Sequence, residues 1–575
     1  MQKSVIFQQD TKILGIKSFN EVAMDFKQIC KSITTITASF VDIRRSGYTY
    51  VDKTDLIYEL AWQRSFYFLS RPRRFGKSTL VSTLEELFLH GVKSYEGHDS
   101  YFKGLEIEKK WTDENEYLVF HLDISTIQGK ANEDSTLFAK SLKRKIIDFA
   151  KSNSLEVDES CEGVFETFEY ILNQVDGPKV VLLIDEYDYP LTKNLDLKDN
   201  FDGITKVLRE LYTAVKVYAS KFRFCFITGI TRYKDSSIFT AGSPISDISQ
   251  EEKFGTLVGI TKDELQTFYK PNLQWIASVK NHKSFEEVTA SDLEKTLDEI
   301  TYWYDGYCFD SECKTHVYTT WSILKLFQSE KAKFEKYWYD IGGLPSILTH
   351  SFDKIIENKD EILSNDLAVR VGDFDNPSSF TDMDARVLLF QTGYLSFSKP
   401  KDDTYYYLKF PNFEVFSAFK THLLAKAFKQ SEQAYRMCMM QDIDCLENVS
   451  EIVDFLEQIL NLVDFEQYPI NSEAAVVNCI YLFLCALKGS KVSVNQHTSL
   501  GRADLVVDSD NRRLVFEFKF CKIGNDPKAL LKKAQDQMIK KRYGKTANTP
   551  QNLQAIALVF SQESRSFVEF SEVKY

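Results

Sequence analysis

The 575-residue sequence lacks the patterns that mark secreted, membrane-spanning and zinc-stabilised proteins. Its ten cysteines form no C-x-x-C pair and several lie inside apolar runs, which predicts reduced core thiols without a disulfide framework or zinc site. No apolar run approaches the ~18 residues that a membrane helix needs. The N-terminal MQKSVIFQQDTK also has no signal-peptide hydrophobic segment. We therefore expect a cytoplasmic protein without a membrane partner.

Glycine and proline are also scarce, at 23 and 12 residues, whereas phenylalanine and tyrosine number 44 and 29. This balance favours compact domains joined by short linkers over disordered tethers. The length is that of about three or four domains. A formal net charge of −12 argues against a wholly basic nucleic-acid-binding protein but leaves room for a local basic cleft.

The stretch FYFLSRPRRFGKSTLVSTL, residues 66–84, has the order of a phosphate-binding loop. An apolar strand is followed by a polar turn, by Gly76-Lys77-Ser78 and by a helix. Backbone N–H groups at such a helix start can face phosphates, Lys77 can reach the β- and γ-phosphates, and Ser78 can ligate Mg²⁺. The match to G-x-x-x-x-G-K-[ST] is incomplete, because Arg71 stands where the first glycine is expected.

Four apolar strands separated by helical segments predict a parallel α/β sheet. They cover residues 66–69, 117–124, 180–184 and 222–228. Ligands of such sheets bind at the carboxyl ends of the strands. The polar residues at or just beyond these ends are Lys77, Asp123, Asp185 and Thr228.

Asp185 and Glu186 follow the apolar run VVLLI, which suits a second nucleotide motif. Asp185 would hold Mg²⁺, directly or through water, and Glu186 would orient or deprotonate the attacking water. The alternative is an acid pair that caps the next turn, and the preceding GKS favours the nucleotide role. Thr228 has two interpretations that stay open, a sensor of the γ-phosphate or a satisfied strand-end hydroxyl. Arg232 likewise suits a phosphate contact or a salt bridge to the cluster at 185–188.

Several long motifs resemble the predicted AAA-ATPase-like family of bacterial proteins. They are GYTYVDKT, FLSRPRRFGKSTLVSTLEELF, VVLLIDEYDYPL, ITGITRYKDSSIFTAGSPISDIS, WYDGYCF, FQTGYLSF and YLKFPNFEV. In that family R-P-R-R-F-G-K-S is the usual form of the loop, so the resemblance implies an atypical phosphate loop in which Arg71 is no local defect. It implies ATP and Mg²⁺ as ligands, with nucleotide contacts from Arg73, Arg74, Phe75, Gly76, Lys77, Ser78, Thr79, Asp185 and Thr228.

The C-terminal text GRADLVVDSDNRRLVFEFKF predicts a β-hairpin that carries a second site. Glu517 and Lys519 are two residues apart on one strand, so both side chains leave the same face. Asp504 can lie alongside on the adjacent strand. Two carboxylates and an ammonium suit a Mg²⁺ site for phosphodiester hydrolysis, in which the metal activates water and Lys519 positions the nucleophile or steadies developing charge.

The competing interpretation of this hairpin is an exposed ion pair of little energetic weight. The neighbouring positions, however, are Phe516, Phe518 and Phe520, which predicts burial of both faces. A buried Glu and Lys need compensating partners, which favours a functional site.

The hairpin resembles the PD-(D/E)XK nuclease superfamily. The resemblance assigns Asp504, Glu517 and Lys519 to the metal and catalytic positions, and Glu473 to the acidic, metal-binding position of the preceding helix. It assigns Gln537 and Tyr543, in QMIKKRY, to a further motif. Ala503 stands where the superfamily usually has proline.

Between residues 519 and 545 the charge of the chain reverses, with nine Lys or Arg against two Asp. A helix carrying Lys532, Lys533, Lys540, Lys541 and Arg542 could follow a nucleic-acid backbone. Gln537, Lys540, Lys541 and Tyr543 are accordingly assigned to nucleic-acid contact. The alternative is a solvated basic helix face.

We thus expect an α/β multidomain protein. Its predicted parts are an N-terminal extension (1–38), a P-loop AAA-type parallel α/β core (39–260), a helical lid (261–350), a winged-helix-like module (351–430), a helical connector (431–470) and a restriction-endonuclease-like α/β domain (471–575).

The favoured function is an ATP-binding, Mg²⁺-dependent nuclease acting on DNA, in which the nucleotide state gates the nuclease or its assembly. The alternatives are a non-catalytic nucleotide-dependent switch and, third because no arginine finger is evident, a ring motor. A homo-oligomer is left open.

Overall fold

The computed structural model describes residues 32–127, 134–233, 243–340, 345–351, 354–355, 362, 367–375, 383–427, 443–463, 470–484, 491–498, 501–509, 512–542 and 552–574. The chain divides into two compact units, Met1–Phe416 and Ser417–Tyr575. None of the helices in the described residues combines the length and apolar character required to span a bilayer.

The first unit contains a five-stranded sheet in the order β2-β3-β4-β1-β5. The strands are β1 (Ser65–Ser70), β2 (Leu118–Asp123), β3 (Val180–Asp185), β4 (Phe222–Gly229) and β5 (Ser246–Asp247). All neighbouring pairs are parallel, which confirms the predicted parallel sheet. β4 lies between β1 and β3, so the loop after β1 and the acids after β3 flank the end of β4. β5 has only two residues and left no signal in the sequence.

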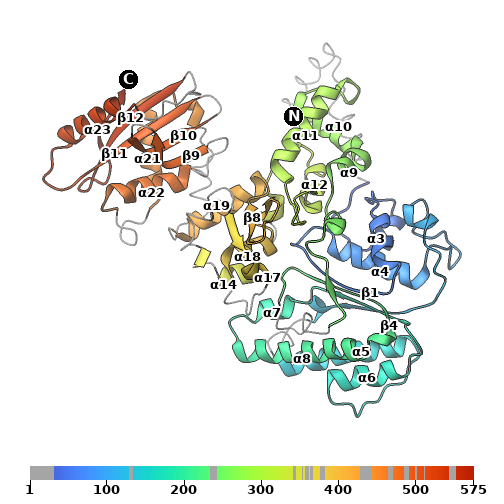
Figure 1. Cartoon of the computed structure of the whole chain (residues 1–575). Helices are drawn as coiled ribbons and strands as arrows, with labels where there is room; N and C mark the ends of the chain where they lie inside the picture. The colour runs from blue at the N-terminus through green and yellow to red at the C-terminus, as the bar shows by residue number, and fades with distance from the viewer. Residues whose placement is uncertain are drawn as a thin grey trace, which may run out of the picture. The chain divides into compact units, whose positions relative to one another are not determined.

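Helices cover both faces of this sheet (Figure 1). On one side lie α3 (Thr54–Ala61) and α4 (Lys77–His90), and on the other α5 (Ser135–Ser152), α6 (Val164–Asn173) and α8 (Lys198–Val217). The alternation of β2 explains the two layers. Phe120 stacks on Phe149 of α5, whereas the next residue, His121, pairs with Glu85 of α4 at 2.9 Å. β3 and β4 are buried along their whole length, as central parallel strands are.

A helical region follows in the first unit. It consists of α9 (Lys262–Phe268), α10 (Lys270–Asn281), α11 (Ala290–Tyr304) and α12 (Thr320–Phe327). These helices pack on an aromatic-rich cluster that includes Tyr269, Trp275 and Tyr304. Capping boxes at Thr261 and Thr289 fix the starts of α9 and α11.

The first unit also holds a small antiparallel sheet, β6-β8-β7. Its strands are β6 (Leu367–Arg370), β7 (Ser396–Lys399) and β8 (Tyr405–Lys409), and α18 (Ala385–Thr392) precedes β7. Phe390 and Phe397 pack with centroids 4.5 Å apart, which joins the helix to the sheet. α19 (Phe413–Ala427) begins in this unit.

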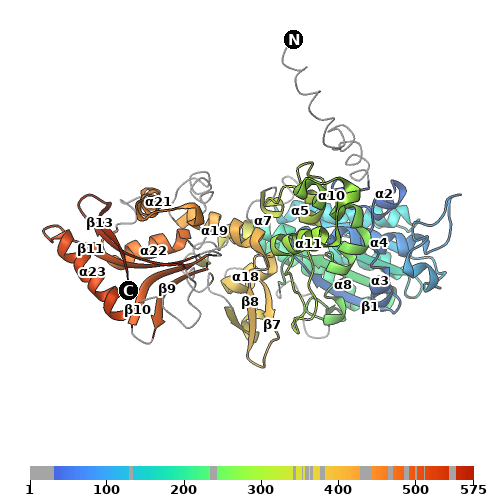
Figure 2. The same cartoon turned by 90° about the horizontal axis from the view of Figure 1, so that it is seen from above.

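The second unit is a mixed sheet in the order β13-β12-β11-β10-β9. The strands are β9 (Lys491–Thr498), β10 (Gly501–Asp508), β11 (Arg513–Cys521), β12 (Leu553–Ser561) and β13 (Phe567–Val573). Only the β11–β12 pair is parallel. α21 (Val449–Asn461) and α22 (Glu473–Leu484) lie on one side and α23 (Pro527–Lys541) on the other (Figure 2). The two units together confirm an α/β multidomain protein.

Candidate functional sites

The loop between β1 and α4 curls tightly, with left-handed backbone at Arg74 (φ 71°) and Gly76 (φ 98°). Arg71, in contrast, does not have positive φ. Its backbone N–H donates to the Gly229 carbonyl at 3.1 Å and so continues the β1–β4 ladder by one bond. Position 71 therefore does not need the conformational freedom of glycine. This explains how arginine can replace the first glycine of the motif.

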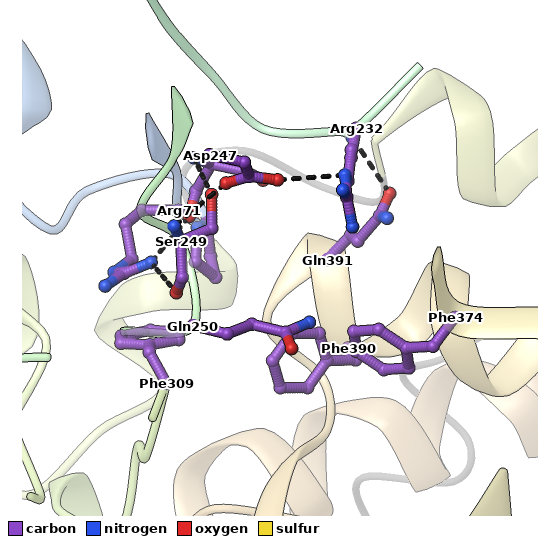
Figure 3. A pocket seen from close by; sticks show the side chains of 11 residues that line it. Arg71, Arg232, Asp247, Ser249, Gln250, Phe309, Phe374, Phe390 and Gln391 are labelled. Atoms are coloured by element: carbon purple, nitrogen blue, oxygen red, sulfur yellow. Dashed lines mark hydrogen bonds and ion pairs between the residues drawn. The ribbon is translucent and has the colours of Figure 1, made fainter. Parts of the chain in front are cut away.

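The Arg71 side chain lies beside Ser249 and Phe309 and fastens the base of the loop (Figure 3). It is almost fully buried and donates to the carbonyls of Ser249 at 2.6 Å and Phe254 at 3.2 Å. Its guanidinium lies 4.5 Å from the centre of the Phe309 ring. Burial lowers the pKa of Arg71 to about 10, so the side chain stays charged at neutral pH.

Arg71 and Arg232 both line a cavity of about 30 Å³. Arg232 pairs with Asp247 of β5 at 2.9 Å. Asp247 is not part of the acid cluster at 185–188, which the sequence suggested as one possible partner of Arg232.

The carbonyl side of the loop is held by residues that are distant in the sequence. The Trp338 indole donates to the Arg73 carbonyl at 3.2 Å, and the Gly259 N–H donates to the Phe75 carbonyl at 2.8 Å. Arg74 itself donates to the Trp338 carbonyl at 2.9 Å and stacks over Trp321. Arg74 is thus engaged away from the concave side of the loop.

The backbone N–H groups of the loop differ from its carbonyls. Within the described part of the chain, no acceptor faces the backbone N–H groups of residues 73–79. Lys77 lies among them, 7% exposed, with its Nζ donating to the carbonyls of Arg71 at 3.0 Å and Pro72 at 2.9 Å. Ser78 is exposed and Thr79 half-buried. A run of N–H groups without a protein acceptor, next to an ammonium, is suited to form an anion-binding cradle.

The predicted acids lie next to this cradle. Asp185 ends β3 and is buried, and its Oδ1 accepts from the Glu186 N–H at 2.9 Å. Glu186 has left-handed backbone at φ 51°. Burial raises the pKa of Glu186, while the charge of Lys77 opposes the rise. Burial lowers the pKa of Lys77, against the attraction of Asp185 and Glu186, so the three groups share one electrostatic site.

Thr228 is fully buried, and its hydroxyl donates to the Leu69 carbonyl at 2.7 Å. Of its two interpretations, this geometry favours the satisfied strand-end hydroxyl, which ties β4 to β1.

The sequence did not reveal the residues that brace the acids. Asp188 Oδ2 accepts from the Thr231 N–H at 2.7 Å, and the Tyr187 hydroxyl donates to the Thr231 carbonyl at 2.9 Å. Gly229 makes room for both, because a Cβ there would lie 2.5 Å from Asp188 Oδ1. The repeated acids and aromatics of DEYDY were the available signal, but nothing in them identified the partner.

A larger cavity, about 130 Å³, adjoins the loop at Gly76, Thr79 and Leu80. Its other walls are mainly apolar. They include Ile43, Tyr50, Val51, Ile57, Leu257, Val258, Ile260, Tyr269 and Leu324.

The second site lies where β10 and β11 separate. Their pairing ends at Leu505↔Phe516, so Asp504 and Glu517 stand just beyond the last pair. Beyond this pair the Phe518 N–H donates to a side chain, Asp504 Oδ2, at 2.9 Å. The fork thus brings the predicted residues of the two strands together.

Glu517 and Lys519 form a buried pair inside the fork. They are 1% and 8% exposed, as the flanking phenylalanines predicted. Lys519 Nζ donates to Glu517 Oε1 at 2.8 Å and to the Phe518 carbonyl at 2.7 Å. Burial, with the charge of Asp504, raises the pKa of Glu517 to about 7. Burial lowers the pKa of Lys519, but the charges of Glu517, Glu473 and Asp504 together outweigh burial, so the pKa of Lys519 is raised.

Glu473, the first residue of α22, completes the group. Its Oε1 accepts from Lys519 Nζ at 3.4 Å. Burial raises the pKa of Glu473, and Lys519 counteracts this rise.

These residues fit Mg²⁺. Glu517 Oε2 is buried and has no hydrogen-bond partner in the described residues, so it is an oxygen ligand without a present role. No set of three or more His, Cys, Asp or Glu in the described ranges forms a ready metal cage. Mg²⁺ does not require one, since it binds through one or two carboxylates and completes its shell with water and substrate phosphate oxygens.

The residues assigned to nucleic-acid contact lie on or after α23. Gln537, Lys540 and Lys541 belong to this helix, and Lys540 is exposed whereas Lys541 is half-buried. Ala534 and Met538 bury its other face against the sheet. Tyr543 falls outside the described residues.

Comparison with known proteins connects these two sites to two families. Residues 35–239 match the family model described as Predicted AAA-ATPase, and residues 471–570 match that of the PD-(D/E)XK nuclease superfamily. The two matches confirm that these regions are similar to the two families. The first match contains the phosphate loop and the acids after β3, and the second contains the whole fork. Trp338 lies in neither match.

A curated relative is described as an uncharacterized protein in the vnfD 5′ region of Azotobacter chroococcum mcd 1. It is 28% identical over 556 residues, which cover 92% of this chain and 97% of the relative. The likeness therefore runs through nearly all of both chains.

Proposed function

We propose that the chain is an ATP-binding, Mg²⁺-dependent nuclease that acts on DNA and whose nucleotide state gates cleavage or assembly. The observation that carries the nuclease assignment is the buried Glu517 carboxylate, with one oxygen on Lys519 and the other without a partner, beside Asp504. A buried ion pair of purely structural purpose would have its remaining oxygen hydrogen-bonded.

In the nucleotide site, the N–H groups of residues 73–79 and Lys77 would bind the phosphates. Ser78 and Asp185 would hold Mg²⁺, which neutralises charge on the transferred phosphate. Glu186 would orient the attacking water, and its raised pKa makes it a better base than an ordinary glutamate. The 130 Å³ cavity beside Gly76 has the apolar walls that a flat base requires. The helices α9–α12 would act as the lid, and the region of β6–β8 as a winged-helix-like module.

In the nuclease site, Asp504 and Glu517 would hold Mg²⁺, with Glu473 at its edge. The ion supplies an activated water and shields the phosphate. Lys519 is fixed by Glu517 and the Phe518 carbonyl, so its ammonium is oriented before substrate arrives. It would position the attacking water or stabilise charge on the phosphate. Lys540 and Lys541, with Gln537 and Tyr543, would follow the DNA backbone.

The test is cleavage of single- and double-stranded DNA and RNA by the purified chain, with Mg²⁺ or Mn²⁺, with and without ATP. Lys519→Ala should reduce metal-dependent cleavage by about 100-fold or more, the usual range for a positioned proton-transfer or charge-stabilising group. Lys522→Ala removes an exposed lysine three residues away and should leave cleavage unchanged.

Cleavage of equal rate in wild type and Lys519→Ala would refute the nuclease site. If neither protein cleaves any substrate and no metal binds at Asp504 and Glu517 by calorimetry, a non-catalytic nucleotide switch becomes the better account.

A further inference from the structure

Trp338 joins the phosphate loop to the start of α19. Its indole N–H donates to the Arg73 carbonyl at 3.2 Å, and its own carbonyl accepts from Arg74. Its backbone N–H donates to Glu414 Oε1 at 2.7 Å. One residue therefore contacts the loop through its ring and carbonyl and the helix through its N–H.

Glu414 is the second residue of α19 and is fully buried. Its second oxygen, Oε2, accepts from the Ser322 hydroxyl at 2.8 Å. Burial lowers the pKa of Arg74, and the charge of Glu414 opposes that effect. A carboxylate is costly to bury, and its partners are correspondingly fixed. The carboxylate is thus linked to the loop both by hydrogen bonds and by charge.

The start of α19 is clamped to the first unit at two further points. Asn412 donates to the Asp305 carbonyl at 2.8 Å and accepts from the Val415 N–H at 3.1 Å. Gly306 packs so closely that a Cβ there would lie 2.1 Å from the Pro411 carbonyl oxygen. The same helix continues past Phe416, where the division between the two units falls.

The two sides of the loop belong to the same peptide units. The N–H groups of residues 73–79 have no acceptor within the described part of the chain, while the carbonyls of residues 73–75 accept hydrogen bonds from residues between 259 and 338. Because a peptide unit is planar, an N–H that turns toward a phosphate moves the carbonyl of the preceding residue with it. Nucleotide binding would therefore alter the bond from Trp338 to Arg73.

We propose that Glu414 is a positioning residue that, through Trp338, holds the phosphate loop and transmits its nucleotide state to α19 and so to the nuclease unit. This inference rests on the proposed function and names the residues through which its regulation runs. Both residues lie outside the regions that match known families.

The test uses full-length protein and measures ATP binding and the ratio of nuclease rates with and without ATP. Glu414→Gln replaces one acceptor oxygen by a donor, and Trp338→Phe keeps an aromatic ring but removes the indole N–H that reaches Arg73. Both should move the ratio toward one by about two- to thirtyfold, the range for residues that carry coupling. Ser322→Ala, which removes the bond to Oε2 but keeps Trp338 in place, is the matched control and should keep the wild-type ratio.

The nuclease rate without ATP should be unchanged in all three variants, which separates lost coupling from misfolding. Lys77→Ala should lose both ATP binding and the response. Normal ATP binding with an unaltered ratio in Glu414→Gln and Trp338→Phe would refute this inference alone. A wild-type protein that binds no ATP would refute the proposed function and this inference with it.

Discussion

The two buried lysines of the candidate sites have different hydrogen-bond partners. Lys77 donates to two backbone carbonyls, and burial lowers its pKa. A phosphate can replace these neutral acceptors without leaving a carboxylate unpaired. Lys519 instead contacts Glu517, whose charge raises the pKa of Lys519 against burial. It stays protonated over the whole physiological range, which suits electrostatic support of a phosphate and not proton abstraction.

Glu517 should make metal binding pH-dependent. Its pKa of about 7 means that a proton competes with the metal below neutrality. We expect Mn²⁺ affinity, measured by calorimetry, to rise by up to about tenfold per pH unit below pH 7 and to level off above it. Glu517→Gln should abolish this dependence, whereas Glu563→Gln, at an exposed position, should retain it.

The raised pKa of Glu517 also predicts how the free energy of unfolding changes with pH when no metal is bound. The folded state binds the Glu517 proton more tightly than the unfolded chain does. The contribution of this proton to the free energy of unfolding is therefore fully present below about pH 4.5. It is lost as pH rises through about 7, at no more than about 1.4 kcal/mol per pH unit. A second unit that gained stability over this range, relative to Glu517→Gln, would contradict the assignment.

The residue types in the sequence predicted the chemistry of the sites, but they did not predict which contacts the side chains make. The GKS and ExK patterns are local, so spacing alone identified Lys77, Glu517 and Lys519 as candidates. Arg74 was assigned to the nucleotide through the family resemblance, and Thr228, in one of its two interpretations, from its place at a strand end. Their observed partners, Trp338 and Leu69, are distant in sequence and could not be read from it.

At the scale of elements, the end of β4 must fit closely against the turn after β3. Gly229→Ala would place a Cβ 2.5 Å from Asp188 Oδ1 and 2.6 Å from the Tyr187 ring. We expect a loss of about 1–3 kcal/mol in the free energy of unfolding of the first unit, as for other overpacked sites. Weaker ATP binding should accompany it, because Asp188 follows Asp185 and Glu186 on this turn.

Gly372→Ala is the matched control, since nothing lies within 4 Å of its added Cβ and Gly372 is in α17 (Val371–Asp375). It should be neutral or slightly stabilising in urea denaturation. Equal effects of the two substitutions would show that the β3–β4 contact does not matter.

Elements with continuous apolar runs were predictable, and elements defined by pairing were not. β3 and β4 are buried on both faces, and β1 and β2 are partly buried, which produces the apolar runs that the sequence shows. β5 pairs with β1 through only two residues. The hairpin of β10 and β11 was expected, but the fork at Leu505↔Phe516 depends on where pairing stops, and no local pattern encodes that.

At the scale of the whole molecule, the two sites belong to separate folding units with separate cores. The parallel sheet and its loop lie within Met1–Phe416, and the fork lies within Ser417–Tyr575. The sequence anticipated both regions because each carries its own motif. The boundaries that it placed inside the first unit stay predictions.

Ligands should therefore stabilise the two units independently. A ligand that binds only the folded state adds about 2.7 kcal/mol at 100 times its Kd. In calorimetric unfolding of the full chain, ATP with Mg²⁺ should raise one transition, and Mn²⁺ alone should raise the other. Lys77→Ala should remove the first shift and keep the second, while Asp504→Asn should do the reverse. Loss of both shifts in either variant would mean that the two sites do not act as separate binding centres. The link through α19 would then couple the free energies of unfolding of the two units in addition to the proposed regulation.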